Sequence, residues 1–288
     1  MSRQILVTGA TGAVGRQVAS QLLEAGAGVR ALTRGTADLP SAVEGVRGDL
    51  SRPGSLDGAA EGVEAVFLVW PFASVEGLEP VLRTAAGHAR RVVYLSSAAV
   101  RDHEREAERL IARSGLEWTI LRPHAFAANT LRWAEQIRAR GVVRGPYGRA
   151  AMSPVHERDI AAVAVRALTR DGHAGAVYEL TGPHSLTQAE QARVIGEVIG
   201  EPVHWEEAPA QDARREMLAR GWPAEVVDGI LSAQAEMAGG PAPVTATVEQ
   251  VTGSGARTFR AWVAEHAHAF RRRDHRADGP LPAGRPPR

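Results

Sequence analysis

Residues 4–28, QILVTGATGAVGRQVASQLLEAGAG, combine a short apolar run, three closely spaced glycines and an amphipathic segment. Apolar side chains at Val14, Val18 and Leu22 recur at helical spacing, and Gly26 or Gly28 can end that helix. The stretch therefore predicts a buried strand, a tight turn and a helix in direct succession.

The glycines of this turn predict a binding site for a diphosphate. Gly9 permits the tight turn, Gly12 lets a pyrophosphate approach the backbone, and Gly15 lets the helix pack closely on the strand. The N-terminus of the helix adds amide donors and a positive dipole end. Incidental glycines in an ordinary turn are the less favoured interpretation, because both flanking elements have the pattern that the motif requires.

Strand and helix patterns alternate through the first half of the chain. After residues 4–8, strands are expected at 29–34, 46–50, 65–70, 91–97 and 117–123, with helices at 55–63, 78–89 and 104–115. Such alternation predicts right-handed crossovers and an α/β fold with a Rossmann-type, doubly wound parallel sheet.

The second half is less regular. We expect a helix at 157–169 capped by Asp159, a strand at 176–182, a helix at 185–200 with a Thr187–Glu190 capping box, a strand at 202–208, and helices at 210–221 and 258–270. The predicted organisation is a nucleotide-binding domain over residues 1–150, a smaller α/β substrate lobe from segments of 151–270, and a disordered basic, proline-rich tail over 271–288.

The end of the second expected strand bears on the choice of dinucleotide. Arg34 lies 19 residues after Gly15, where an acidic residue would bind the ribose of NAD. An arginine there can pair with a 2′-phosphate, so we predict NADP(H) in preference to NAD(H). In the alternative, Arg34 is solvated and Asp38 binds the ribose.

Composition excludes several chemistries. All 34 basic residues are arginine, so Schiff-base chemistry, a phosphate-loop lysine and a Tyr-x-x-x-Lys dyad are impossible. The chain has no cysteine, and its ten histidines are scattered, so we expect no metal site. A net charge of +1 and the lack of a long apolar run predict no nucleic-acid and no membrane partner. We expect a mature N-terminus, a cytoplasmic location, a small-molecule substrate, and a monomer or homodimer.

Several ordered motifs resemble one family. They are ILVTGATGAVG (5–15), VRALTR (29–34), GDL (48–50), VVYLSSAAV (92–100), SGLEWTILRPHAFAAN (114–129), ERDIAAVAVRAL (157–168), YELTGPHSLTQAE (178–190) and RTFRAWVAEHAHAF (257–270). In these the chain is similar to NmrA-like atypical short-chain dehydrogenases/reductases, near the NAD(P)H-quinone and azo reductase-like proteins. The resemblance covers roughly residues 4–270 and is specific for fold and cofactor, but not for substrate.

The resemblance implies a set of cofactor contacts along the strand ends. Gly9, Thr11, Gly12, Val14 and Gly15 would surround the pyrophosphate, Arg34 the 2′-phosphate, Asp49 and Leu50 the adenine, Val69, Trp70 and Pro71 the ribose, and Ser96 and Ser97 the nicotinamide, with Arg122 and Pro123 under the substrate pocket.

The chain departs from the family at the positions expected to handle protons. Val100 and Glu104 stand where relatives carry the tyrosine and the lysine or histidine, and His124 stands where relatives often have glycine. His124 is the first candidate for a polar group facing the acceptor, and His103 is the second. For each, the alternative is a loop histidine that only bonds backbone.

The segment after the last expected strand supplies candidates for the substrate pocket. Phe126, Asn129 and Trp133 follow on an expected helix and would wall the pocket, although Trp133 can equally be core, and His156 could point into the cleft.

Two classes of function fit these observations. The first is an NADP(H)-dependent oxidoreductase that reduces a small conjugated acceptor (a quinone, enone or azo compound), with the proton delivered by water, delivered by a histidine, or not required. The second is a non-catalytic NADP(H) sensor. A biosynthetic enzyme that uses NADP(H) redox-neutrally, for an isomerisation or cyclisation, is a third possibility.

Overall fold

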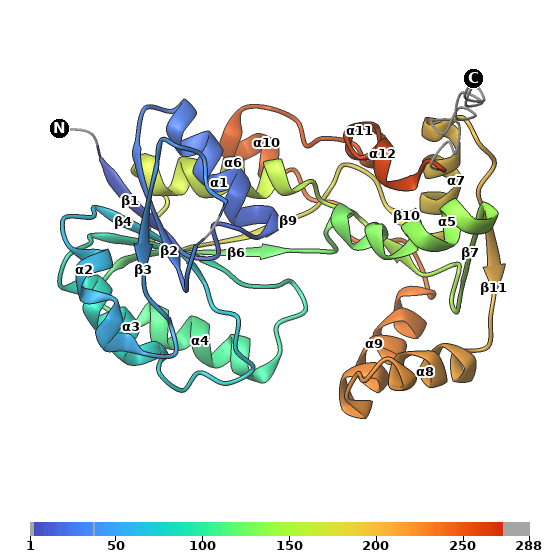
Figure 1. The fold of residues 1–288 in the computed structure, drawn as a ribbon, viewed down its shortest axis with the longest axis horizontal. Helices are drawn as coiled ribbons and strands as arrows, with labels where there is room; N and C mark the ends of the chain where they lie inside the picture. Colours follow the sequence, from blue (N-terminus) through green and yellow to red (C-terminus); the bar gives the residue numbers. More distant parts are fainter. Residues whose placement is uncertain (1–2, 37, 273–288) are drawn as a thin grey trace, which may run out of the picture.

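Seven parallel strands form the central sheet, in the order β3-β2-β1-β4-β5-β6-β9 (Figure 1). The computed structural model describes residues 3–36 and 38–272. The strands are β1 (Gln4–Val7), β2 (Gly28–Thr33), β3 (Val43–Arg47), β4 (Ala65–Val69), β5 (Arg91–Leu95), β6 (Glu117–Pro123) and β9 (Ala176–Leu180). The order reverses between β1 and β4, which opens a crevice at the carboxyl ends of these strands. The expected Rossmann-type sheet is confirmed.

Helices cover both faces of the sheet. α1 (Ala13–Glu24), α6 (Glu157–Thr169) and α10 (Thr247–Thr252) lie on one face, and α2 (Asp57–Ala60), α3 (Leu78–Ala86) and α4 (Asp102–Ala112) on the other, with a short 3-10 turn η1 (Pro53–Ser55) before α2 (Figure 1). Successive residues of a strand point to opposite faces of the sheet and pack in two separate cores. Phe67 packs on the side of α1 and α6, while Val66 and Leu68 pack on the side of α3 and α4. This is why β4 is apolar throughout.

The turn between β1 and α1 has the geometry that its glycines predicted. Gly9 has a φ of +64°, in the left-handed region. A Cβ atom on Gly15 would lie 2.1 Å from the carbonyl oxygen of Gly9, so only glycine lets α1 start this close to β1. Gly12 is the N-cap residue of α1.

A second lobe lies beyond the carboxyl end of β6. It contains η2 (Ala127–Trp133, a 3-10 helix), α5 (Ala134–Arg140), β7 (Val142–Gly145), β8 (Ala151–Met152), β10 (Leu186–Thr187), α7 (Gln188–Ile199), β11 (His204–Glu207), α8 (Ala210–Ala219), α9 (Ala224–Met237), α11 (Phe259–Glu265) and α12 (Ala267–Phe270). Its core includes Trp133, Ile137, Ile195, Trp262 and Phe270. β7 pairs with β11, and β8 pairs with β10.

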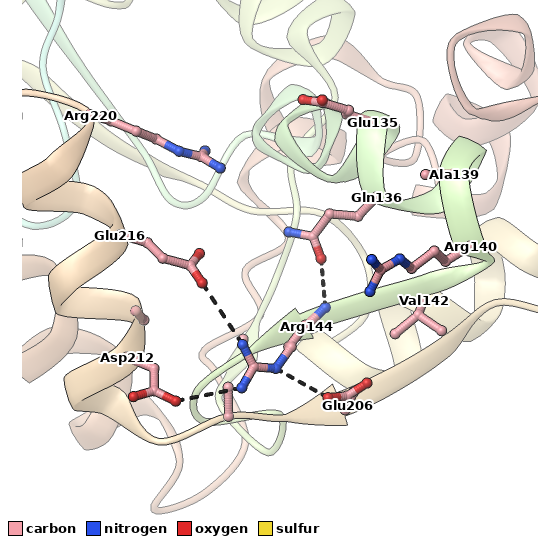
Figure 2. Close-up of a pocket in the computed structure, with 13 residues that line it drawn as sticks. Glu135, Gln136, Ala139, Arg140, Val142, Arg144, Glu206, Asp212, Glu216 and Arg220 are labelled. Carbon is pink, nitrogen blue, oxygen red and sulfur yellow. Dashed lines mark hydrogen bonds and ion pairs between the residues drawn. The ribbon is translucent and has the colours of Figure 1, made fainter.

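Within this lobe, ion pairs of one arginine connect α8 to β7 (Figure 2). Arg144 of β7 pairs with Glu206, Asp212 and Glu216 at N–O distances of 3.1, 3.5 and 3.8 Å, and its backbone amide donates to Gln136. These groups surround a hollow of about 380 Å³. Because three carboxylates already bind Arg144, we assign this hollow a structural role.

Several details differ from the expectations. A boundary at residue 150 is wrong, because η2, α5 and β7 precede it and pack in the second lobe, while α6, β9 and α10 follow it and pack in or on the main sheet. β3 begins at Val43 rather than 46, so the expected strand at 46–50 runs past the strand into a loop.

The structure also differs from two expectations about helices, and the expected tail lies mostly outside the described residues. The helix expected at 258–270 breaks at His266 into α11 and α12. The cap of α6 is His156, not Asp159, whose buried carboxylate pairs with Arg257. Most of the expected tail, 273–288, lies outside the described residues. Among the described helices, none has both the length and the apolarity to span a membrane.

The Gly9–Gly15 contact gives a direct test of the turn. We expect Gly15→Ala to lower the free energy of unfolding by about 2 kcal/mol or more, because the added methyl group overlaps a backbone oxygen. Urea titration of purified protein measures this.

Gly229→Ala is the matched control, since a Cβ there, inside α9, meets no atom within 4 Å. It should leave stability unchanged or raise it by up to about 1 kcal/mol. Equal behaviour of the two variants would contradict the proposed packing constraint.

Candidate active site

A cleft of about 600 Å³ lies at the carboxyl ends of β1, β2 and β4. Its lining brings together seven residues predicted from the sequence: Gly9, Thr11, Arg34, Asp49, Leu50, Val69 and Pro71. Phe72, which the sequence did not single out, joins them and packs edge-on against Trp70, with ring centroids 4.8 Å apart. The diphosphate of a dinucleotide fits beside the glycine turn, because Gly9 and Thr11 line this cleft and Gly12, the N-cap of α1, lines the second cleft on the other side of Thr11.

Arg34 and Asp49 give the cleft its charge. Arg34 is exposed and makes no hydrogen bond or ion pair with any residue that the structure describes, whereas Asp38 is absent from the lining. Asp49 accepts the Ser51 amide at 2.9 Å and the Ser51 hydroxyl at 2.8 Å. These bonds hold the pKa of Asp49 below its ordinary value, so the carboxylate is ionised at neutral pH.

Three predicted side chains lie in the core instead. Val14 packs between α1 and the sheet, and Trp70 is buried with its Nε1 donating to the Ser74 carbonyl at 2.7 Å. Any contact of these two residues with a ligand is therefore through their backbone. Trp133 packs in the core of the second lobe, so its placement on a pocket wall is wrong.

A buried carboxylate connects the ends of β5 and β6 to α4. Ser96 donates its hydroxyl to Glu108 at 2.6 Å, and Arg122 donates through Nε to the same carboxylate at 3.0 Å. This bond raises the pKa of Arg122. Ser97 accepts the Ala99 amide at 3.2 Å, and Ala98 donates its amide to the Pro123 carbonyl. Sequence reasoning missed Glu108, whose only signal was its helical spacing from Glu104.

Glu104, at one dyad position, and Tyr94, on the preceding strand, are both structural. Glu104 accepts the Arg101 amide at 2.8 Å in a capping box at the start of α4. Tyr94 is buried on β5, and burial, reinforced by Glu104 and Glu108, raises its pKa to about 12. Neither residue can therefore act as the proton donor of a Tyr-Lys pair.

The histidines differ in their position. His124, just past β6, is partly exposed; its Nε2 lies 3.9 Å from Glu179 Oε2, is covered by protein, and has no hydrogen-bond partner among the described residues. His103 is partly exposed in the first turn of α4. Asn129 is exposed on η2, and Phe126 is half-buried against the main core.

His156 belongs to a second cleft, of about 680 Å³, between the glycine turn and the second lobe. Thr11, Gly12 and Leu131 also line this cleft. His156 itself is buried, accepts the Arg158 amide at Nδ1, and has Nε2 3.5 Å from Glu265. Burial lowers its pKa, so the ring is neutral at pH 7.

The profile of a family described as NAD(P)H-binding matches residues 9–171, more than half of the chain. The chain belongs to this NAD(P)H-binding family. A "(4-alkanoyl-5-oxo-2,5-dihydrofuran-3-yl)methyl phosphate reductase" of Streptomyces griseus is 43% identical over 280 residues, 92% of this chain and 99% of the relative. An "NAD(P)H azoreductase" of Xenophilus azovorans is 34% identical over 92% of this chain and 99% of the relative.

Solved structures of NAD(P)H-binding reductases have the same fold as this chain. An NADPH-dependent quinone oxidoreductase from Escherichia coli has a TM-score of 0.74 at 25% identity, covering 91% of this chain and 99% of that one. A triphenylmethane reductase from Citrobacter, at 21% identity and a TM-score of 0.77, shares the fold. The expected NmrA-like, atypical short-chain dehydrogenase/reductase type is confirmed, and the chain is an NAD(P)H-dependent oxidoreductase.

The burial of His156 predicts a pH dependence of stability. Desolvation keeps its pKa in the fold below the unfolded value near 6.5, so below pH 6.5 the unfolded chain binds more protons. Stability is therefore complete above pH 6.5 and falls as the pH drops below it. His156→Asn, which can still cap α6 and does not titrate, should reduce this loss by up to about 1.4 kcal/mol per pH unit.

Urea titrations at pH 7.5 and 5.5 measure the effect. His88→Asn, at an exposed position, is the control and should keep the wild-type pH dependence. A His156→Asn variant whose stability falls as steeply as that of the wild type would contradict the assignment.

Proposed function

We propose that this enzyme uses NADPH to reduce the conjugated carbon–carbon double bond of an alkanoyl-butenolide, a five-membered unsaturated lactone that carries a methyl phosphate ester group. The observation that supports this most is the 43% identity to the Streptomyces griseus reductase over nearly its whole length. The site is consistent with it, since a conjugated acceptor needs no Tyr-Lys pair.

The preference for NADP(H) follows from Arg34. Its guanidinium stands at the end of β2, lines the 600 Å³ cleft, and makes no hydrogen bond or ion pair with the described residues. A 2′-phosphate would provide a partner, whereas a bare ribose would leave the guanidinium unpaired. Asp38, the alternative ribose ligand, does not line the cleft.

When bound, the cofactor supplies a hydride. In the substrate named for the relative, ring carbon 3 is β to both the alkanoyl ketone and the lactone carbonyl, so hydride adds there and the electron pair moves to carbon 4. The resulting enolate is delocalised over both carbonyl groups and takes its proton from water. This stabilisation removes the need for a strong acid beside the acceptor.

The protein then contributes position rather than acid catalysis. Glu108 holds Ser96 and Arg122 together, which fixes the ends of β5 and β6 relative to one another beneath the acceptor. His124, two residues after Arg122, is partly exposed and Asn129 is exposed, so each can offer a polar group to the acceptor.

Cofactor selectivity tests the role of Arg34. Arg34→Ala should raise the dissociation constant for NADPH about 10- to 100-fold, the cost of a charge-assisted hydrogen bond, and change that for NADH less than about threefold. Fluorescence titration measures both. Arg52→Ala is the control, because Arg52 lies near Asp49 but does not line the cleft. Equal losses for both cofactors would contradict the proposal.

The acceptor class is tested by NADPH oxidation with a panel of compounds. We expect turnover of an alkanoyl-butenolide phosphate and of activated enones or quinones, and none of isolated aldehydes or ketones. His124→Ala should lower kcat less than about tenfold, whereas loss of an essential general acid costs 100-fold or more. Efficient reduction of an isolated carbonyl compound, or no turnover of any conjugated acceptor while NADPH still binds, would refute the proposed reaction.

A further inference from the structure

One arginine on the segment that follows β6 is not explained by the fold. Arg132 lies in the last turn of η2, the helix that carries the chain from β6 into the second lobe. Residues three apart share a face of a 3-10 helix. Ala127, Thr130 and Trp133 form the buried face, and Ala128 and Leu131 form a face that lines the cleft opposite the glycine turn. Arg132 and Asn129 share the third face, and both are exposed.

The guanidinium of Arg132 has no anionic partner. It makes no hydrogen bond or ion pair with residues 3–36 or 38–272, and its Cζ stands 5.6 Å from the centroid of the Trp133 ring. By contrast, Arg138 and Arg144, which follow on α5 and β7, are bonded to a carbonyl group and to carboxylates. A cation–π contact restrains the head group and leaves its N–H donors free.

The guanidinium of Arg132 is partly desolvated although its side chain is accessible to solvent. Neighbouring protein lowers the pKa of this guanidinium by desolvation. A restrained, partly desolvated guanidinium without a carboxylate binds a phosphate dianion strongly, because its planar donors match two phosphate oxygens.

The proposed reaction places a phosphate close to this position. In the substrate named for the Streptomyces griseus relative, phosphorus is three bonds from the ring carbon that accepts hydride. Its binding residue must therefore stand beside the acceptor site rather than in a remote part of the lobe. Arg132 is on the same helix face as Asn129, on the segment that begins at the carboxyl end of β6.

We propose that Arg132 binds the phosphate group of the substrate and thereby orients the acceptor ring above the sheet ends. This rests on the proposed function, which it deepens by assigning the substrate's anion to one side chain. Arg132 selects phosphorylated acceptors over the corresponding alcohols.

The test compares two compounds and three variants. The compounds are a 4-alkanoyl-butenolide methyl phosphate and its dephosphorylated alcohol. Arg132→Met removes the charge and keeps an apolar stem, and Arg132→Lys keeps the charge without the planar fork. Arg113→Met removes an exposed arginine at the end of α4 whose side chain makes no hydrogen bond or ion pair with the described residues. Arg132→Met should lower kcat/KM for the phosphate about 10- to 100-fold and for the alcohol less than about threefold. Arg132→Lys should be intermediate, and Arg113→Met should match the wild type.

A ³¹P NMR titration with the phosphate ester gives a readout that does not depend on turnover. Wild type and Arg113→Met should shift and broaden the phosphorus resonance, and Arg132→Met should not, with melting temperatures confirming that each variant is folded. If the wild type binds the ester but reduces neither compound, the proposed function fails and the Arg132 assignment stands.

Three results would overturn the assignment itself. The first is no binding of the ester by the wild type, or equal binding by Arg132→Met. The second is an equal loss of kcat/KM for the phosphate and the alcohol, which indicates a structural role. The third is a rise in the KM for NADPH in Arg132→Met as large as its loss of kcat/KM for the phosphate, which would assign Arg132 to the cofactor.

Discussion

The approach of α1 to β1 is the constraint on which the site depends. With no side chain at Gly15, the first turn of α1 reaches the carbonyl oxygen of Gly9, and the helix N-terminus faces the crevice between β1 and β4. A methyl group at this position would push the helix away from the strand. The amides of the turn would then leave the positions from which they can meet a diphosphate.

The sheet could be predicted from the sequence because local pattern and topology agree there. The strands centred on Leu6 and Phe67 are short apolar runs bounded by turns, and a parallel sheet with two covered faces requires such runs. The errors lie where tertiary contacts decide. His156 caps α6 although Asp159 is the better capping residue, because Asp159 is buried against Arg257. α9 was missed because few of its side chains are buried, which leaves a weak apolar pattern.

The site was predictable where it is built from backbone and strand ends, and less so where it is built from paired side chains. The cofactor cleft collects residues that each follow a strand, so their order in the chain sufficed. Glu108 could not be identified, because its role depends on Ser96 and Arg122, which only folding brings to it. The same applies to Arg132, because its lack of an anionic partner among the described residues is a property of the folded surroundings, not of its neighbours in sequence.

The residues around the missing Tyr-Lys dyad have structural roles. Tyr94 is turned into the core, Glu104 caps a helix, and the polar pair Glu108–Arg122 joins α4 to β6. A site without a Tyr-Lys dyad suits acceptors whose own carbonyl groups stabilise the charge that hydride addition creates.

The chain passes repeatedly between its two lobes, with η2, α5 and β7 in one, α6 and β9 in the other, and α7 and β11 in the first again. The second lobe is thus not a cassette that recombination could exchange for another. New substrate specificity on this scaffold is more readily reached by exchanging individual side chains in place, and η2 offers such positions because Asn129 and Arg132 are exposed while its opposite face is buried.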